Sequence, residues 1–163
     1  MEKHKIRLTA DAKLLDEYLS SYNRCKHRKK ILEERRIHIL NEFQAPLKPK
    51  KLTGLPKAKG LTDEGSAALS LQLDDIDIRI KEKIEDVKKE YVRLNEILDF
   101  LELNDSGRIV LEYKYIDSLP WWEMELLEHR SKTTLVYVWR KALYKLLEFP
   151  RVKQILSDYV KTI

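Results

Sequence analysis

The side chains of this sequence best suited to chemistry are cationic and hydroxyl groups near its carboxyl end, in the stretch SKTTLVYVWRK. Lysine and arginine bind phosphate oxygens, and arginine can also donate two hydrogen bonds to a guanine base. At 3.6 residues per turn, most of these side chains point away from a buried apolar face. The residues expected to contact double-stranded DNA are Ser131, Lys132, Thr133, Thr134, Tyr137, Arg140 and Lys141.

Three closely spaced helices are predicted to position this stretch. Between the second and the third, His129, Arg130 and Ser131 leave room only for a tight turn, and the Ser131 hydroxyl can cap the helix that follows. This spacing is typical of a helix-turn-helix, whose last helix can enter the DNA major groove. The apolar positions assigned to the three helices are Ile109, Val110, Tyr113 and Ile116, then Trp121, Met124 and Leu127, then Leu135, Val138, Trp139, Ala142, Leu143 and Leu146.

Two adjacent tryptophans begin the second of these helices. Neighbouring helical residues cannot share one face, so one indole should pack in the core and the other should be partly exposed. Because Met124 continues the stripe of Trp121, we assign Trp121 to the core and Trp122 to the surface. After the third helix, Pro150 favours the start of a short tail helix. Its apolar positions are Val152, Ile155, Leu156 and Tyr159.

The turn formers from Asn104 to Gly107 predict a boundary between a helical segment, residues 1–104, and a DNA-binding domain, residues 105–163. Within the first segment, residues 45–61 combine proline, glycine and lysine without periodicity, which predicts a flexible basic linker. The expected fold is all-α, with a long antiparallel helical hairpin, or coiled coil, followed by a small helix-turn-helix domain.

The hairpin is predicted from apolar residues that alternate by three and four positions. A first helix, capped by Thr9 or Asp11, should reach about Phe43, and a second should span about residues 62–104. The apolar stripe of the first helix is Leu15, Tyr18, Tyr22, Cys25, Leu32, Ile39 and Phe43. The stripe of the second is Leu73, Ile80, Ile84, Val87, Tyr91, Leu94, Leu98 and Leu101.

Charged residues interrupt both stripes, at Lys29 and Arg36 in the first and at Asp77 in the second, where Ile76 is the apolar substitute. The sequence up to residue 61 has 16 Lys or Arg against 7 Asp or Glu, whereas residues 62–104 have 6 against 12. The opposite charges favour pairing of the two helices, although apolar burial must dominate the stability. A two-helix hairpin leaves apolar surface partly covered, so we expect a homo-oligomer, most simply a dimer.

No residue pattern indicates an enzyme, a cofactor site or a metal site. The sequence has no glycine-rich phosphate loop, and its single cysteine, Cys25, cannot form an internal disulfide. Asp74 to Asp77 are expected to form an acidic helix surface. No signal-peptide or membrane-spanning pattern is present, so a cytoplasmic location without a membrane partner is expected. The four histidines, which lack metal-ligand spacing, are His4, His27, His38 and His129.

The carboxyl-terminal third resembles the helix-turn-helix of phage late transcriptional activators of the RinA/ArpU type, a module similar to region four of bacterial sigma factors. The resemblance rests on LEYKYID, on the Trp-x-Glu step at Trp121, on Ser131 before the next helix, and on Tyr137 followed by RKAL. It implies a long helical segment ahead of the module, binding upstream of late genes, and recruitment of host RNA polymerase. It also implies that Ser131, Lys132, Thr133, Thr134 and Tyr137 lie at the DNA-facing start of the recognition helix.

The sequence departs from that pattern in the second helix and the turn. Pro120 replaces a serine cap, Glu125 replaces a small residue, and the turn contains no glycine. A carboxylate at a close helix crossing requires a partner. The alternative function is therefore a non-enzymatic helical interaction protein, either a polymerase-binding adaptor or a subunit like a small terminase that assembles into a ring for DNA packaging.

Overall fold

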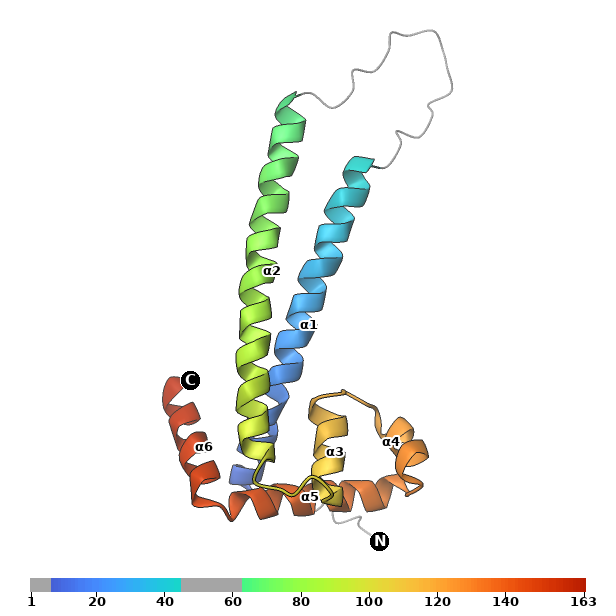
Figure 1. Ribbon diagram of the computed structural model, residues 1–163, viewed down its shortest axis with the longest axis vertical. Coiled ribbons are helices and arrows are strands. Elements are labelled where there is room, and N and C mark those ends of the chain that lie inside the picture. The colour runs from blue at the N-terminus through green and yellow to red at the C-terminus, as the bar shows by residue number, and fades with distance from the viewer. Residues whose placement is uncertain (1–6, 45–62) are drawn as a thin grey trace. The chain divides into compact units, whose positions relative to one another are not determined.

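The computed structural model describes residues 7–44 and 63–163, and every regular element within these ranges is an α-helix (Figure 1). The all-α fold predicted from the sequence is confirmed, with a hairpin of two long helices followed by short ones. The predicted linker, residues 45–61, lies outside the described residues. The helices are α1 (Ala10–Gln44), α2 (Asp63–Leu98), α3 (Ser106–Tyr115), α4 (Trp121–Glu128), α5 (Lys132–Leu147) and α6 (Pro150–Thr162).

The long helices α1 and α2 pack against each other in opposite directions. Ser21 donates a hydrogen bond to Glu90 over 2.6 Å, whereas Arg36, later in α1, donates one to Asp77, earlier in α2. The Arg36–Asp77 pair, at 2.6 Å, joins two of the charged residues that interrupt the apolar stripes. This hydrogen bond lowers the pKa of the Asp77 carboxyl. Beside it, Ile76 is buried as the predicted apolar substitute.

The ends of the long helices follow local hydrogen-bonding rules. The hydroxyl of Thr9 accepts a hydrogen bond from the backbone N–H of Ala12 over 3.4 Å, which confirms Thr9 as a cap of α1. α2 ends at Leu98, earlier than the predicted end near Asn104. There the Leu101 amide donates to the Leu98 carbonyl over 2.9 Å, a three-residue step that tightens the last turn. Leu101 is nevertheless buried, as its place in the stripe predicted.

The chain forms two compact units, one made of residues 25–87 and the other of the segment up to Arg24 together with Lys88–Ile163. We call the second the base unit. The predicted boundary between residues 104 and 105 does not coincide with these units, because the start of α1 and the end of α2 pack with the short helices. The ring pairs that join these segments are Tyr18 with Tyr159 and Phe100 with Phe149, with centroids 5.1 and 5.0 Å apart.

α3 buries a different face from the predicted one. Leu111 and Tyr115 are buried with Val110, because the face with Gly107 lies against α5. A β-carbon at position 107 would lie 2.8 Å from the β-carbon of Ala142, so only glycine permits this close approach. The predicted positions that are only half-buried are Ile109, Tyr113 and Ile116.

Arg108 joins α3 to the end of α2, and its side chain is 8% exposed. The guanidinium donates hydrogen bonds to the carbonyls of Leu98 and Leu101 over 3.2 and 2.9 Å, and pairs with Asp99 and Glu112 at 3.0 and 2.8 Å. Its hydrogen bond to Glu112 raises the pKa of Arg108. Arg108 therefore donates to two carbonyls at and just beyond the end of α2, where helical partners run out; for Leu98 it is a second donor beside the Leu101 amide.

Candidate nucleic-acid interface

The turn between α4 and α5 is as short as predicted. α4 ends at Glu128, and His129 adopts a left-handed backbone conformation with φ 52° and ψ 39°. Ser131 precedes α5 in extended conformation, and its Oγ accepts a hydrogen bond from the Thr134 backbone N–H over 3.4 Å. The predicted Ser131 cap is confirmed. The Thr134 hydroxyl lies 3.0 Å from the Ser131 hydroxyl, so both side chains belong to the cap.

The carboxylate of Glu125 reaches the amino terminus of α5. Its Oε1 accepts a hydrogen bond from the backbone N–H of Lys132, the first residue of the helix. The carboxylate expected to need a partner therefore has one, and its negative charge is favourable at the positive end of the helix dipole. One amide that a phosphate would use at this helix end is consequently occupied.

The inner face of α5 is held by aromatic contacts. Trp139 donates a hydrogen bond from Nε1 to the Tyr115 hydroxyl over 3.0 Å, and this hydroxyl donates in turn to the Asp16 carboxylate. Burial, reinforced by Asp16, raises the pKa of Tyr115. The Trp121 ring meets Trp139 edge-on at 6.1 Å, but Trp121 is only half-buried, so it packs at the edge of the core and not fully inside it as predicted. Lys114 lies 5.0 Å from the Trp139 ring centroid. These contacts fix α5 against α1, α3 and α4.

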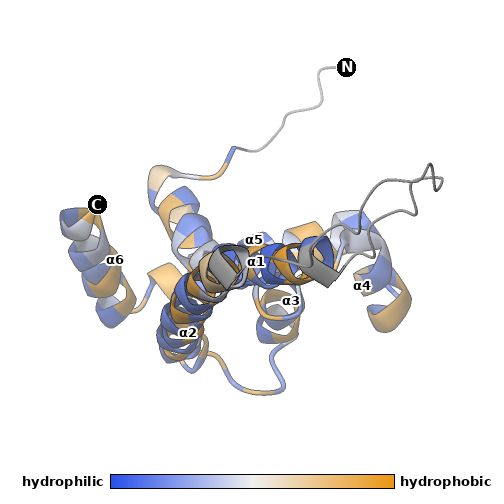
Figure 2. Cartoon of the chain, turned by 90° about the horizontal axis from the view of Figure 1, so that it is seen from above, coloured by the Kyte–Doolittle hydropathy of each residue, from blue (hydrophilic) through white to orange (hydrophobic). Residues whose placement is uncertain are grey.

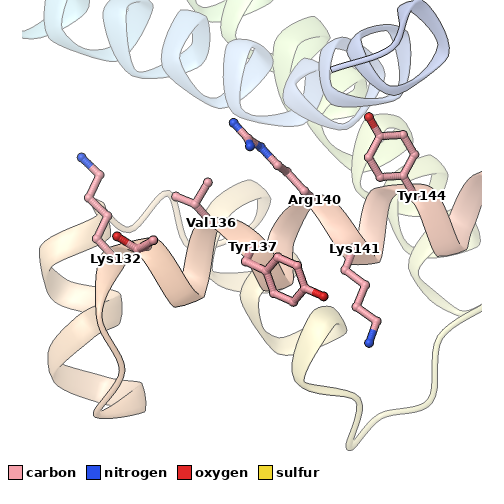
Figure 3. A pocket seen from close by; sticks show the side chains of 7 residues that line it. Lys132, Val136, Tyr137, Arg140, Lys141 and Tyr144 are labelled. Atoms are coloured by element: carbon pink, nitrogen blue, oxygen red, sulfur yellow. The ribbon is translucent and has the colours of Figure 1, made fainter. Parts of the chain in front are cut away.

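The outer face of α5 borders an open groove of about 670 Å³ (Figure 3). Tyr137, which is 65% exposed, lies on this face, while Arg140 and Lys141 point to opposite sides of the helix. Hydroxyl and cationic side chains therefore line the same outer face of α5. The residues lining the groove are Lys132, Thr133, Val136, Tyr137, Arg140, Lys141 and Tyr144.

Five of the seven residues predicted to contact DNA line this groove. Ser131 and Thr134 do not; their hydroxyls are exposed and bonded within the helix cap. The sequence prediction did not include the two other lining residues, Val136 and Tyr144. Tyr144 is half-buried, and its hydroxyl accepts a hydrogen bond from the Thr9 backbone N–H over 3.3 Å.

Three cations in the groove differ from their charged neighbours. Lys145, the next basic residue along α5, pairs with Asp105 at 2.7 Å, and this hydrogen bond lowers the pKa of the Asp105 carboxyl. Lys132, Arg140 and Lys141 form no ion pair with any residue that the structure describes. The Nε of Arg140 is buried without a hydrogen-bond acceptor in the described part of the chain. The groove thus holds three cationic side chains that no carboxylate of the described ranges pairs with.

A second exposed surface lies on α4. Met124 is buried, but Leu127, predicted to continue the inward stripe, is 54% exposed, because the helix turns that position away from the core. Trp122 is 59% exposed, as predicted, and Leu126 is also exposed. The hydrophobic run of α4 is visible in Figure 2. We call Trp122, Leu126 and Leu127 the α4 patch.

Comparison with known protein families, with characterised proteins and with solved structures returned no match. None of the helices in the described ranges is both long and apolar enough to cross a membrane. Within residues 7–44 and 63–163, no three His, Cys, Asp or Glu side chains gather in a way that could hold a metal ion.

Proposed function

We propose that this protein binds double-stranded DNA through the outer face of α5, as a sequence-specific transcriptional regulator. The observation that carries the proposal is a set of three cations that border an open groove and form no ion pair within residues 7–44 and 63–163: Lys132, Arg140 and Lys141. Phosphate oxygens are the natural counter-charges for such groups, and the exposed Thr133 and Tyr137 add hydrogen-bonding groups beside them.

The packing of α5 in the base unit supports DNA binding by this helix. The inner face of α5 is held by aromatic contacts, while its outer face is open. In Figure 1, α5 runs across the ends of α3 and α4, with the short turn at His129 before it. A helix about 10–12 Å across, side chains included, fits the DNA major groove, which is about 12 Å wide. The proposed recognition element is therefore α5, with α3 and α4 as its support.

The resemblance to phage late activators extends the proposal to a biological role. The protein would bind upstream of late genes and recruit host RNA polymerase in the cytoplasm. A homodimer formed through the α1–α2 hairpin would carry two α5 helices, and each would read one half of a two-fold symmetric site.

The test is a selection of DNA duplexes from a random pool by the full chain, followed by fluorescence anisotropy on the selected duplex and a scrambled one. We expect tighter binding to the selected duplex, with the affinity falling linearly with salt on logarithmic axes. Lys132→Ala should weaken binding. The matched control is Lys153→Ala, which removes an exposed lysine from α6. Equal binding by both variants, or no selected sequence, would contradict the proposal.

The alternative is a protein-binding adaptor or packaging subunit, and the α4 patch is the observation that favours it. Exposed aromatic and aliphatic side chains in one helix are typical of protein interfaces. The same helix carries three negative charges that are unsuited to DNA phosphates, at Glu123, Glu125 and Glu128. If this alternative is correct, Trp122→Ala should abolish binding to the protein partner, whereas Lys132→Ala should leave that binding unchanged.

A further inference from the structure

On the outer face of α5, one polar side chain lies at the centre and cationic side chains lie on either side of it. Tyr137 lies on the side of α5 opposite the buried residues Leu135 and Trp139, and it is 65% exposed. Arg140 and Lys141 flank it and point to opposite sides of the helix (Figure 3). A helix in the major groove presents its central side chains to the bases and its flanking side chains to the two phosphate backbones.

The burial of Arg140 limits what it can reach. Its side chain is half-buried and its Nε is inaccessible to solvent, so the guanidinium cannot extend to the floor of a groove as the exposed Tyr137 can. Arg36 and Arg108 are held by carboxylates, whereas Arg140 has no ion pair to break with any described residue when it turns toward an anion. Its position and its free charge suit a phosphate contact at the edge of α5.

The amino terminus of α5 is less suited to binding a phosphate. The Lys132 amide is bonded to Glu125, and the Thr134 amide to Ser131, so two of the amides that would bind phosphate have partners. The Glu125 carboxylate also repels an approaching phosphate. Arg140 lies about 12 Å further along the helix axis than Lys132, at a rise of about 1.5 Å per residue. The main phosphate contact is thereby displaced from the helix terminus to its middle.

From this geometry we infer that Arg140 and Lys141 hold the phosphates of opposite DNA strands, while Tyr137, with Thr133, contacts base edges and determines sequence preference. The inference rests on the proposed function and deepens it, because it assigns affinity and specificity to different residues of the same helix. Arg140 is thereby assigned to a phosphate and not to a guanine base.

Anisotropy on the selected and scrambled duplexes over a salt series tests this division. Arg140→Gln and Lys141→Gln should weaken binding to both duplexes by the same factor, and each should reduce the salt slope by about 0.9. Tyr137→Ala should leave the slope unchanged and reduce the preference for the selected duplex by about 5- to 150-fold, the range expected for a direct base contact. Arg140→Lys keeps the charge and should retain the slope, which separates loss of charge from loss of folding.

Neutral methylphosphonate linkages then assign the strands. Some methylphosphonates should weaken binding of the wild-type chain. Those on one strand should no longer weaken binding by Arg140→Gln, and those on the other strand should no longer weaken binding by Lys141→Gln. The inference is overturned if Arg140→Gln changes sequence preference, if Tyr137→Ala does not, or if both glutamine variants respond to the same strand. Absence of DNA binding by the wild-type chain would instead overturn the proposed function, and this inference with it.

Discussion

The carboxylate of Glu125 in α4 accepts a hydrogen bond from the backbone N–H of Lys132, so the proposed recognition helix begins on a negative charge supplied by its neighbour. Without such a contact, the amino terminus of a helix is a favourable place for a phosphate. The contact stabilises the turn and at the same time reduces the attraction of the α5 terminus for DNA.

Glu125→Ala should therefore lower the free energy of unfolding by about 1 kcal/mol, the usual contribution of a helix cap, and tighten binding to a scrambled duplex at low salt. Urea unfolding and anisotropy measure the two effects. Glu123→Ala is the matched control, because it removes the same charge from α4 without freeing the Lys132 amide. A gain in affinity no larger for Glu125→Ala than for the control would show that the amide plays no part.

Gly107→Ala should destabilise the base unit by about 1–3 kcal/mol, the usual effect of overpacking. The added β-carbon would lie 2.8 Å from the Ala142 β-carbon and 3.0 Å from Asp105 Oδ1, so α3 and α5 would have to separate. Urea unfolding followed by circular dichroism measures the change. Ser106→Ala, at the exposed neighbouring position, should be nearly neutral, and Ala142→Gly should recover part of the loss in the double variant.

Arg108→Met should also be strongly destabilising. The substitution keeps most of the buried aliphatic length but leaves the Leu101 carbonyl without this donor, at about 1–3 kcal/mol, and removes the second donor of the Leu98 carbonyl. Thermal unfolding should show a lower Tm. Arg79→Met removes an exposed arginine that pairs with Asp75 in α2, and its effect should be small. Equal effects of the two variants would mean that the Arg108 bonds contribute little.

The Asp105–Lys145 pair predicts a pH dependence. The pKa of Asp105 in the folded chain is lowered, first by the hydrogen bond from Lys145 and also by that from the Gly107 amide. Stability from this carboxylate is therefore complete above the ordinary carboxyl pKa of about 4 and is lost as pH falls through the lowered value. Asp105→Asn retains a good cap but loses the charge. Urea unfolding should show a difference between wild type and Asp105→Asn at pH 7 that disappears on acidification; a constant difference would contradict the assignment.

Much of the fold was predictable because it depends on local patterns. The caps at Thr9 and Ser131, the start of α6 at Pro150 and the buried stripe of α5 all follow from residue type and spacing along one helix, although Val138 of that stripe is only half-buried. The opposite faces of Trp121 and Trp122 were predicted for the same reason. Most of the predicted DNA-contacting residues also follow from the period of α5, and the structure brings five of the seven to one groove.

The features that escaped prediction depend on contacts between distant segments. Arg108 reads as a surface arginine in the sequence, and only the carbonyls at the end of α2 explain its burial. α3 buries a different face from the predicted one because Gly107 lies against Ala142, and the spacing of residues within α3 does not reveal this contact. The base unit likewise joins the start of α1 to residues beyond Lys88, so a boundary based on local turn formers missed it.

His129 restricts how this sequence can change in evolution. Its positive φ of 52° is unfavourable for most side chains, and strongly so for valine, isoleucine and threonine. Descendants that keep a three-residue turn should therefore show glycine, asparagine, aspartate or histidine at this position. A lineage that acquires a β-branched residue there should have lengthened the turn, and with it changed the direction in which α5 is presented.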